Sequence, residues 1–189
     1  MAGLRRATWP AHQRLEKRID VKARFATVPA YLAHLRRMWG FCAGIETRLS
    51  ADAFGVALPD YSARRKLPLL TQDLVALGVL PAELAAVPRC DALPELGDTA
   101  AAFGCVYVFE GATLGGRTLL PLVSSRLGCD AARGAAFLAS YGDAVGAMWQ
   151  RFGAALDAFC ADASRRARAE EAATATFTAL EDWLCGASA

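Results

Sequence analysis

YVFEGATLGGRTLL, residues 107–120, is a helical sequence interrupted by three glycines, Gly111, Gly115 and Gly116. Each glycine inside a helix costs about 1 kcal/mol relative to alanine, because glycine loses more backbone entropy on folding. In return, a helix face without side chains can kink and can lie close to a flat ligand or to another helix. The segment therefore predicts either a helix that contacts a ligand or a helix-packing motif, since GxxxG spacing is also a common packing device.

Length and composition predict the fold class. The chain has 189 residues, so we expect a single domain over residues 1–189 with one sizeable core. Hydrophobic residues make up 54% of the chain, alanine and leucine are prominent, and β-branched residues are sparse. This composition favours helices packed on helices. We therefore expect an all-α bundle in which the glycine-rich helix is kinked.

Helical periodicity, caps and breakers predict six or seven helices. Glycine and proline predict a loop over residues 51–61, and two prolines predict a connection over residues 87–98. Asp98 or Thr99 is expected to cap the glycine-rich helix, which Pro121 can also kink. The expected helices are Leu4–Arg18, Pro29–Leu49, Arg64–Leu77, a short turn after Pro81, the glycine-rich helix, a helix capped by Asp130 that runs to about Ala161 with a bend around Gly142 and Gly146, and Ala163–Leu184.

Charge and cysteine usage exclude several classes of protein. The formal net charge is only +2, which argues against a nucleic-acid-binding or membrane-surface protein. No apolar run approaches the ~20 residues of a membrane span, and no apolar signal core follows the basic pair near the N-terminus. The six cysteines show no CxxC pair and no zinc-site spacing, so we expect reduced core thiols and a cytoplasmic location.

The chain has only two histidines, His12 and His34, and no serine or cysteine nucleophile stands beside either. This argues against a hydrolytic triad. Glu16 follows His12 by four residues, so on a helix its carboxylate can accept the second imidazole N–H, as in sites that orient a metal-bound histidine. Ordinary surface pairs have the same spacing. His34 lies among apolar residues and is expected to be a packed or half-exposed structural histidine.

The two patterns together predict a binding site. A histidine with a carboxylate partner and a kinked glycine-rich helix would form a slot, with a nitrogen ligand on one side and bare backbone on the other. Such a slot fits a planar metal macrocycle such as haem. The alternative is an all-α interaction domain in which the glycines pack helices and His12 is a surface residue.

Three segments carry a family resemblance: LRRATWPAHQRLE (residues 4–16), YVFEGATLGGR (residues 107–117) and YGDAVGAMWQRF (residues 141–152). They resemble haem oxygenase, in particular the bacterial, biliverdin-producing, bacteriophytochrome-associated branch. DLVALG at residues 73–78 and TFTALEDWL at residues 176–184 fit in the same order, so the resemblance covers most of the chain. It implies a haem oxygenase-like helical bundle.

The resemblance implies a role for each matched residue. His12 falls at the position of the proximal haem-iron ligand, and Glu16 at the acidic residue that hydrogen-bonds that imidazole. Arg5 is at a position from which a basic side chain can pair with a haem propionate, although a solvated arginine is the alternative. The catalytic distal-helix glycines, which lie against the haem face, match Gly111, Gly115 and Gly116.

The chain also departs from the family pattern. Ala112 stands where some members have an aspartate that organises distal water, so a proton relay must use other groups, and Glu110 and Arg117 are near enough in sequence to be considered. Where some relatives use a lysine or arginine for the propionates, the best-aligned positions include Trp149 and Gly153. Arg151 is nearby, but its helical phase can direct it elsewhere.

The resemblance further implies haem b as both substrate and cofactor, O2 as oxidant, and biliverdin, carbon monoxide and ferrous iron as products. The sequence has no Rossmann fingerprint, so we expect no bound flavin or nicotinamide and an external electron donor: a ferredoxin, a flavodoxin or a reductase. Arg5, Arg6 and Arg14 are candidate docking residues. A bilin-binding photoreceptor is a candidate downstream partner. A non-catalytic haem carrier or sensor on the same fold remains an alternative, because of Ala112.

Overall fold

The computed structural model describes residues 1–49 and 51–186, and in this range the chain forms helices and no β-strand. The helices are α1 (Ala2–Arg18), α2 (Val21–Arg24), α3 (Val28–Arg48), α4 (Ala51–Ala57), α5 (Tyr61–Arg64), α6 (Leu67–Ala76), α7 (Pro81–Ala85), α8 (Thr99–Leu127), α9 (Ala136–Ala139), the 3-10 helix η1 (Gly142–Ala144), α10 (Val145–Phe159) and α11 (Ala163–Cys185). The all-α prediction is confirmed.

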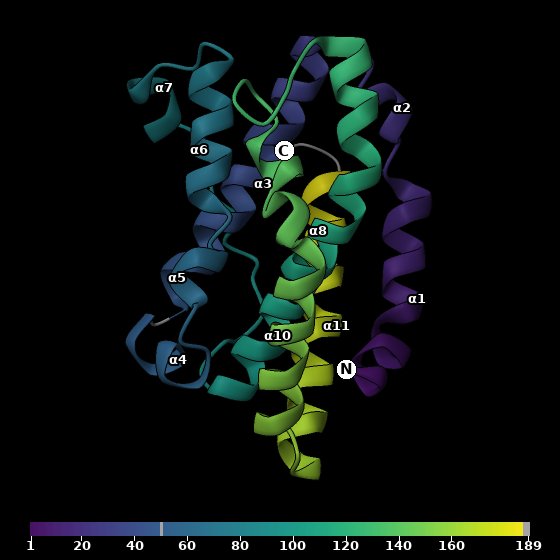
Figure 1. The fold of residues 1–189 in the computed structure, drawn as a ribbon, viewed down its shortest axis with the longest axis vertical. Coiled ribbons are helices and arrows are strands. Elements are labelled where there is room, and N and C mark those ends of the chain that lie inside the picture. Colours follow the sequence, from purple (N-terminus) through teal and green to yellow (C-terminus); the bar gives the residue numbers. More distant parts are fainter. Residues whose placement is uncertain (50, 187–189) are drawn as a thin grey trace.

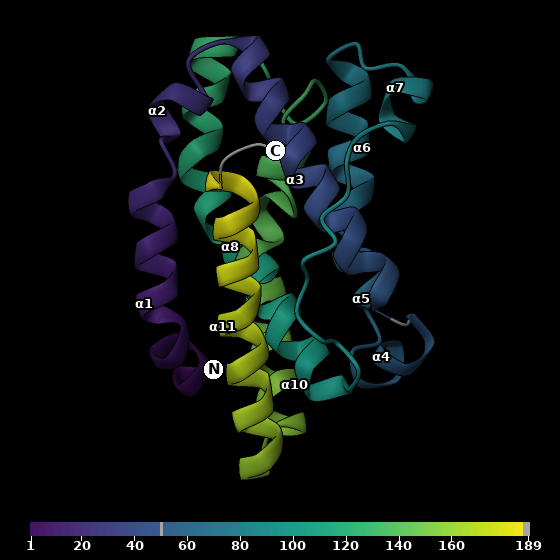
Figure 2. The same ribbon diagram turned by 180° about the vertical axis from the view of Figure 1, so that it is seen from behind.

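The long helices form a bundle around α8. Figures 1 and 2 show α1 and α2 along one edge of the molecule and α4 to α7 along the opposite edge, with α8, α10 and α11 between them. The most extensive contacts join α11 to α8, followed by those that join α1 to α11. The first helix therefore lies on the outside of the bundle, whereas α8 is at its centre.

The α8–α11 contact is close because small residues line it. A Cβ atom added to Gly104 on α8 would overlap the carbonyl oxygen of Ala169 and would lie 2.9 Å from the amide nitrogen of Ala173, both on α11. Ala169 and Ala173 are buried. The two backbones thus touch directly, which fixes how α8 lies on α11.

Local sequence signals explain the ends of the main helices. The Asp98 carboxylate accepts a hydrogen bond from the Ala101 amide at 2.8 Å and caps α8, as predicted. Thr27 caps α3 in the same way, with Pro29 in the first turn. Gly128, in the left-handed region at φ +66°, ends α8. The predicted connection over residues 87–98 and the short helix after Pro81 are also confirmed.

The predicted loop over residues 51–61 is wrong, because this segment contains α4. Phe54 and Leu58 are both buried, so the segment has an apolar face that packs against the core and forms a helix despite Gly55. Phe54 packs edge-on against Phe103 of α8, with ring centroids 5.0 Å apart. Tertiary packing has outweighed local propensity here.

The predicted helix Arg64–Leu77 is divided into α5 and α6. The carboxylate of Glu46, on α3, accepts hydrogen bonds from the backbone amides of Lys66 and Leu67 at 2.6 and 2.9 Å. These amides begin α6 and have no partner within the helix, so a side chain from a distant helix supplies the cap. Gly78, with φ +90°, follows the end of α6, one residue after the predicted end of the helix at Leu77.

The helix predicted to run from Asp130 to Ala161 is also wrong. The Asp130 carboxylate accepts hydrogen bonds from the Ala132 and Arg133 amides, each at 2.9 Å, and closes a tight turn instead of capping a long helix. The chain continues through α9 and η1 before α10 begins at Val145. By contrast, α8 runs through its glycines and Pro121 as one helix, and the kinks expected there stay predictions.

The six cysteines are free thiols. Five of them, Cys42, Cys90, Cys105, Cys129 and Cys160, are buried, whereas Cys185 at the end of α11 is half-buried. Burial raises the pKa of the Cys105 thiol to about 12. Across the described residues, none of the helices has the length and apolar character required to span a membrane.

Candidate haem site

His12 lies on the outer helix α1 with its side chain 41% exposed. Its Nδ1 atom is nevertheless buried, and it lies 3.5 Å from a Glu16 carboxylate oxygen, which is longer than an ordinary hydrogen bond. The exposure of the ring therefore comes from its other atoms, among them Nε2. A half-exposed imidazole backed by a carboxylate at Nδ1 is oriented to offer Nε2 to a ligand.

Two aromatic side chains fix the plane of the His12 ring. Trp9, one turn earlier on α1, stacks on it with ring centroids 5.8 Å apart and an angle of 10° between the planes. Phe177 of α11 meets it edge-on at 5.5 Å. Trp9 itself is 48% exposed, which is unusual for so large an apolar side chain.

The glycines of α8 separate into two environments. A Cβ added to Gly111 or Gly115 would meet no atom within 4 Å, so the backbone is bare at both positions. A Cβ added to Gly116 would lie 2.6 Å from the carbonyl oxygen of Leu138, so this glycine lets α9 approach α8. Helix packing accounts for glycine at this position, and the contact of Gly116 with haem stays a prediction.

We call four positions around the bare glycines the open face of α8: the half-buried Gly111 and the exposed Ala112, Leu114 and Gly115. Leu114 is one of the few large apolar side chains of the described residues that is exposed. An exposed apolar residue beside bare backbone is the surface that a flat apolar ligand would cover.

Tyr107 is a buried residue next to the open face of α8 that the sequence interpretation did not select. It lies one turn before Gly111 and packs against Trp149 of α10, with ring centroids 5.6 Å apart. Burial raises the pKa of the Tyr107 phenol, whereas the nearby Thr8 hydroxyl and the Arg5 guanidinium act in the opposite direction. Thr8 and Arg5 both belong to α1, so the Tyr107 phenol interacts with that helix, and its four-residue spacing from Gly111 is the signal that the sequence offers.

Other candidates for the distal side and the propionates lie elsewhere. Glu110 is buried in a cluster of charges on another side of α8, whereas Arg117 is exposed. A Cβ on Gly153 would meet the Met1 side chain at 3.0 Å. Arg151 lies 3.9 Å from the Asp60 carboxylate and is mostly exposed.

His34, on α3, is the packed histidine that the sequence predicted. It is buried against Phe25, with ring centroids 5.3 Å apart. Burial, assisted by the Arg24 charge, lowers the pKa of the His34 imidazole to about 4. A neutral, enclosed imidazole of this kind is a core residue.

Charged residues of α1 attach it to α11. Glu181 of α11 is almost completely buried and lies 3.4 Å from Arg14 Nε and 2.9 Å from Arg18 Nη1. Arg14 therefore pairs with Glu181, but its side chain is still 52% exposed. Arg5, Arg6 and Arg14 all stay candidate docking residues for an electron donor.

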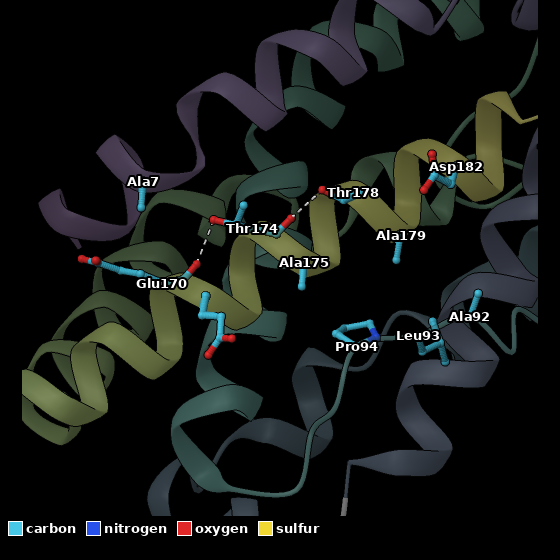
Figure 3. A pocket seen from close by; sticks show the side chains of 11 residues that line it. Ala7, Ala92, Leu93, Pro94, Glu170, Thr174, Ala175, Thr178, Ala179 and Asp182 are labelled. Carbon is cyan, nitrogen blue, oxygen red and sulfur yellow. Dashed lines mark hydrogen bonds between the residues drawn. The ribbon is translucent and has the colours of Figure 1, made fainter.

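One groove on the surface lies apart from His12 and the open face of α8. It has a volume of about 670 Å³ and lies along α11, between Ala7 of α1 and Pro94 of the connection before α8 (Figure 3). Thr174 and Thr178 face it, but their hydroxyls donate hydrogen bonds back to α11 carbonyls. The groove has no histidine or cysteine among its lining residues, and its carboxylates would repel propionates.

The residues of α1 and α8 fit haem. A half-exposed histidine with a covered Nδ1, an exposed tryptophan beside it and bare helix backbone supply an axial nitrogen and flat apolar surface. Arg5 and Tyr107 add a cation and a phenol near the same helices. These donors suit a macrocycle that carries carboxylates.

The comparisons with known proteins agree with this chemistry. The family model described as "Heme oxygenase" matches residues 1–185. A protein named "Heme oxygenase" from Xanthomonas campestris pv. campestris (strain 8004) is 35% identical over 150 residues, which cover 78% of this chain and 84% of the relative. The structure of the NO- and CO-bound haem oxygenase from Neisseria meningitidis has the same fold, with a TM-score of 0.80 over 96% of this chain and 87% of that chain at 23% identity. The chain therefore belongs to the haem oxygenase family of haem-degrading oxidoreductases.

Proposed function

We propose that this protein binds haem b between α1 and the open face of α8 and cleaves it, with O2 and electrons from an external donor, to biliverdin, carbon monoxide and ferrous iron. The observation that supports the proposal is that the chain has both a half-exposed, carboxylate-backed His12 on α1 and bare backbone at Gly111 and Gly115 on α8. Bound haem would supply the iron at which O2 is reduced and the ring that is oxidised.

His12 would hold the haem iron through Nε2. Its orientation is prepared before binding, because Trp9 and Phe177 hold the ring plane and Glu16 lies beside Nδ1. When haem is bound, Glu16 favours the tautomer that carries the proton on Nδ1 and leaves Nε2 free to bind the metal.

The two faces of the site divide the other tasks. Gly111 and Gly115 allow the α8 backbone to lie against the ring and to exclude water from it, since no side chain stands there. Arg5, with Tyr107 close to it, pairs with a propionate and so sets how the ring is rotated in the slot. Gly116 contributes indirectly, by letting α9 support α8.

The partners follow from this arrangement. Electrons come from a ferredoxin, a flavodoxin or a reductase that docks near the exposed Arg5 and Arg6, and no flavin is bound by the chain itself. A bilin-binding photoreceptor is the proposed recipient of the product. The cytoplasmic location stays a prediction from the cysteine content.

A haem carrier or sensor is the second candidate function. Ala112 on the open face is exposed and offers no carboxylate to organise water. A carrier would bind haem through His12 and release it unchanged after reductant and O2 are supplied. Conversion to a bilin distinguishes the two functions.

The test is haemin titration of the wild-type protein, His12→Ala and His34→Gln, followed by aerobic turnover with a competent reductant. We expect the wild type and His34→Gln to give a Soret band and a bilin product. His12→Ala should lose the histidine-ligated spectrum and bind haemin about 100-fold more weakly. Unchanged axial ligation in His12→Ala would contradict the proposed site, and intact haem after wild-type turnover would favour the carrier.

A further inference from the structure

A cluster of charged side chains lies behind the open face of α8. Its centre is Glu110, which directly precedes Gly111 and is only 1% exposed. Lys66 and Arg64 are buried beside it, next to the junction between α5 and α6. Because successive residues of an α-helix point about 100° apart, Glu110 is directed away from the bare backbone at Gly111.

Both carboxylate oxygens of Glu110 accept hydrogen bonds from buried side chains. Oε1 accepts hydrogen bonds from Lys66 Nζ at 3.0 Å and from the Tyr141 hydroxyl at 2.6 Å. Oε2 accepts one from Arg64 Nη1 at 2.5 Å. Glu110 thus joins α8 to the α5–α6 junction and to the segment between α9 and η1.

The partners of Glu110 are themselves bound to one another. Lys66 Nζ also donates a hydrogen bond to the Tyr141 hydroxyl at 2.7 Å. Arg64 Nε and Nη2 donate hydrogen bonds to the two carboxylate oxygens of Asp60, each at 2.7 Å. Two buried cations therefore face the two carboxylates, and the mostly exposed Arg151 lies at the edge of the cluster, 3.9 Å from Asp60.

Such a cluster is a costly way to stabilise a fold. Apolar side chains of similar volume often stabilise a protein as well as a buried ion pair does, because charges lose hydration on burial. Consistent with that loss, burial lowers the pKa of the Lys66 ammonium even though Glu110 opposes the shift. The best-supported use of buried charges is to fix one arrangement of neighbouring elements.

The backbone beside Tyr141 is strained in a way that fits this use. Ser140 has φ +46°, and it is the one non-glycine residue with positive φ in the described parts of the chain. Its hydroxyl is buried without a hydrogen-bond partner. Strain of this kind persists where the surrounding structure requires it, and here it precedes the residue whose hydroxyl reaches Glu110.

The open face has no comparable support. No atom lies within 4 Å of a Cβ added to Gly111 or Gly115, so on that side packing does not hold this part of α8. The anchors of the segment are on its other sides: the Glu110 cluster at one end and the Gly116–Leu138 contact at the other.

We propose that Glu110, held by Lys66, Arg64 and Tyr141, is a positioning residue that fixes the bare Gly111–Gly115 backbone at the height and rotation needed against the haem ring. The proposal rests on the proposed function for what the glycines face. The claim that the cluster immobilises this part of α8 concerns the haem-free protein, so it can be tested without haem.

The first test is hydrogen exchange, followed by mass spectrometry, of peptides that cover residues 107–118 in the haem-free protein. We expect Glu110→Gln to speed exchange of these amides by about tenfold, because the neutral amide cannot hold both cations. Glu181→Gln is the matched control: it removes another buried carboxylate with two arginine partners, but on α11. This control should leave residues 107–118 unchanged.

Tyr141→Phe provides a milder variant that keeps every charge of the cluster and removes one hydroxyl. It should speed the same exchange by a smaller factor, about two- to threefold, and it answers the question even where Glu110→Gln fails to fold. The proposal would be overturned if the amides of residues 107–118 exchange at the wild-type rate in Tyr141→Phe or in folded Glu110→Gln.

The second test uses the haemin complex. Because His12 is unaltered, haemin affinity in Tyr141→Phe and Glu110→Gln should stay within about threefold of the wild type, while the turnover rate falls by about tenfold in Glu110→Gln. Equal losses of affinity and rate would indicate general destabilisation and contradict a positioning role. Failure of the wild type to bind haemin would refute the proposed function, but it would leave the exchange result to decide the positioning role.

Discussion

Gly104 and Gly111 lie two helical turns apart on nearly the same side of α8, yet their surroundings are opposite. The backbone of α11 covers Gly104 so closely that an added Cβ would overlap a carbonyl oxygen, whereas nothing lies within 4 Å of a Cβ on Gly111. The two positions show that one residue type serves two purposes along a single helix. At Gly104 the missing side chain lets helices touch, and at Gly111 it leaves backbone available to a ligand.

The histidines show the same contrast. His12 belongs to the open region, where its ring is half-exposed and oriented by Trp9 and Phe177. His34 belongs to the packed interior and is kept neutral by burial. Substitutions in the interior should therefore change stability, and substitutions in the open region should change binding.

The largest effect is expected for Gly104→Ala. Both neighbouring groups are backbone atoms of α11, so α8 and α11 must move apart, which should cost about 3 kcal/mol of unfolding free energy. Thermal unfolding followed by circular dichroism measures the loss. Gly146→Ala on α10, where an added Cβ meets nothing within 4 Å, is the control and should not be destabilised. Equal melting temperatures for the two variants would contradict the claim that Gly104 is needed for close helix packing and Gly146 is not.

A pH series sharpens the contrast between the histidines. His34 has its pKa lowered from 6.5 to about 4, so the unfolded chain takes up a proton first as the pH falls. The folded state should therefore lose up to about 1.4 kcal/mol per pH unit between these two values. Burial raises the pKa of the Asp73 carboxyl to about 6, and this acts in the opposite direction as the pH falls through 6.

The comparison between wild type and His34→Gln cancels the Asp73 contribution. Denaturant unfolding at pH 7, 5.5 and 4.5 gives the difference in unfolding free energy at each pH. We expect the wild type to lose unfolding free energy relative to His34→Gln, by more at each lower pH, as the pH falls below 6.5. A difference that does not change with pH would show that His34 is not held neutral.

The smallest effect on stability is expected for Gly111→Ala, which should stabilise the haem-free protein, whereas Gly104→Ala destabilises it. Alanine has less entropy to lose than glycine, and its methyl group meets no atom here, so the haem-free protein should gain about 0.5–1 kcal/mol. The same methyl group should weaken haemin binding, because it separates the backbone from the ring. Melting temperature and haemin titration, measured on one preparation, test both directions.

Much of the fold was visible in the sequence because the decisive signals are local. Asp98 at the start of α8 and Pro29 in the first turn of α3 act within a few residues of where they stand. The errors came from long-range contacts. Glu46 caps α6 from about twenty residues away, and buried Phe54 makes a helix from a segment that contains glycine and proline.

The candidate site divides in the same way. His12, Glu16 and the bare pair Gly111 and Gly115 could be selected by spacing, because each pair lies on one helix. Glu110 could be noticed only as a neighbour of Gly111, since its partners Arg64, Lys66 and Tyr141 are 46, 44 and 31 residues away. Such a cluster exists only after the helices have assembled.

The half-buried Cys185 offers a site for covalent labelling. The other five thiols are buried, so we expect an alkylating dye to react first with Cys185 in the folded protein. The carbonyl oxygens of Leu184 and Cys185 accept hydrogen bonds from Arg24 and Arg18, so the label would stand where the end of α11 meets the segment that follows His12. Fluorescence from that position would follow in real time how the outer helix responds as haemin enters and as bilin leaves.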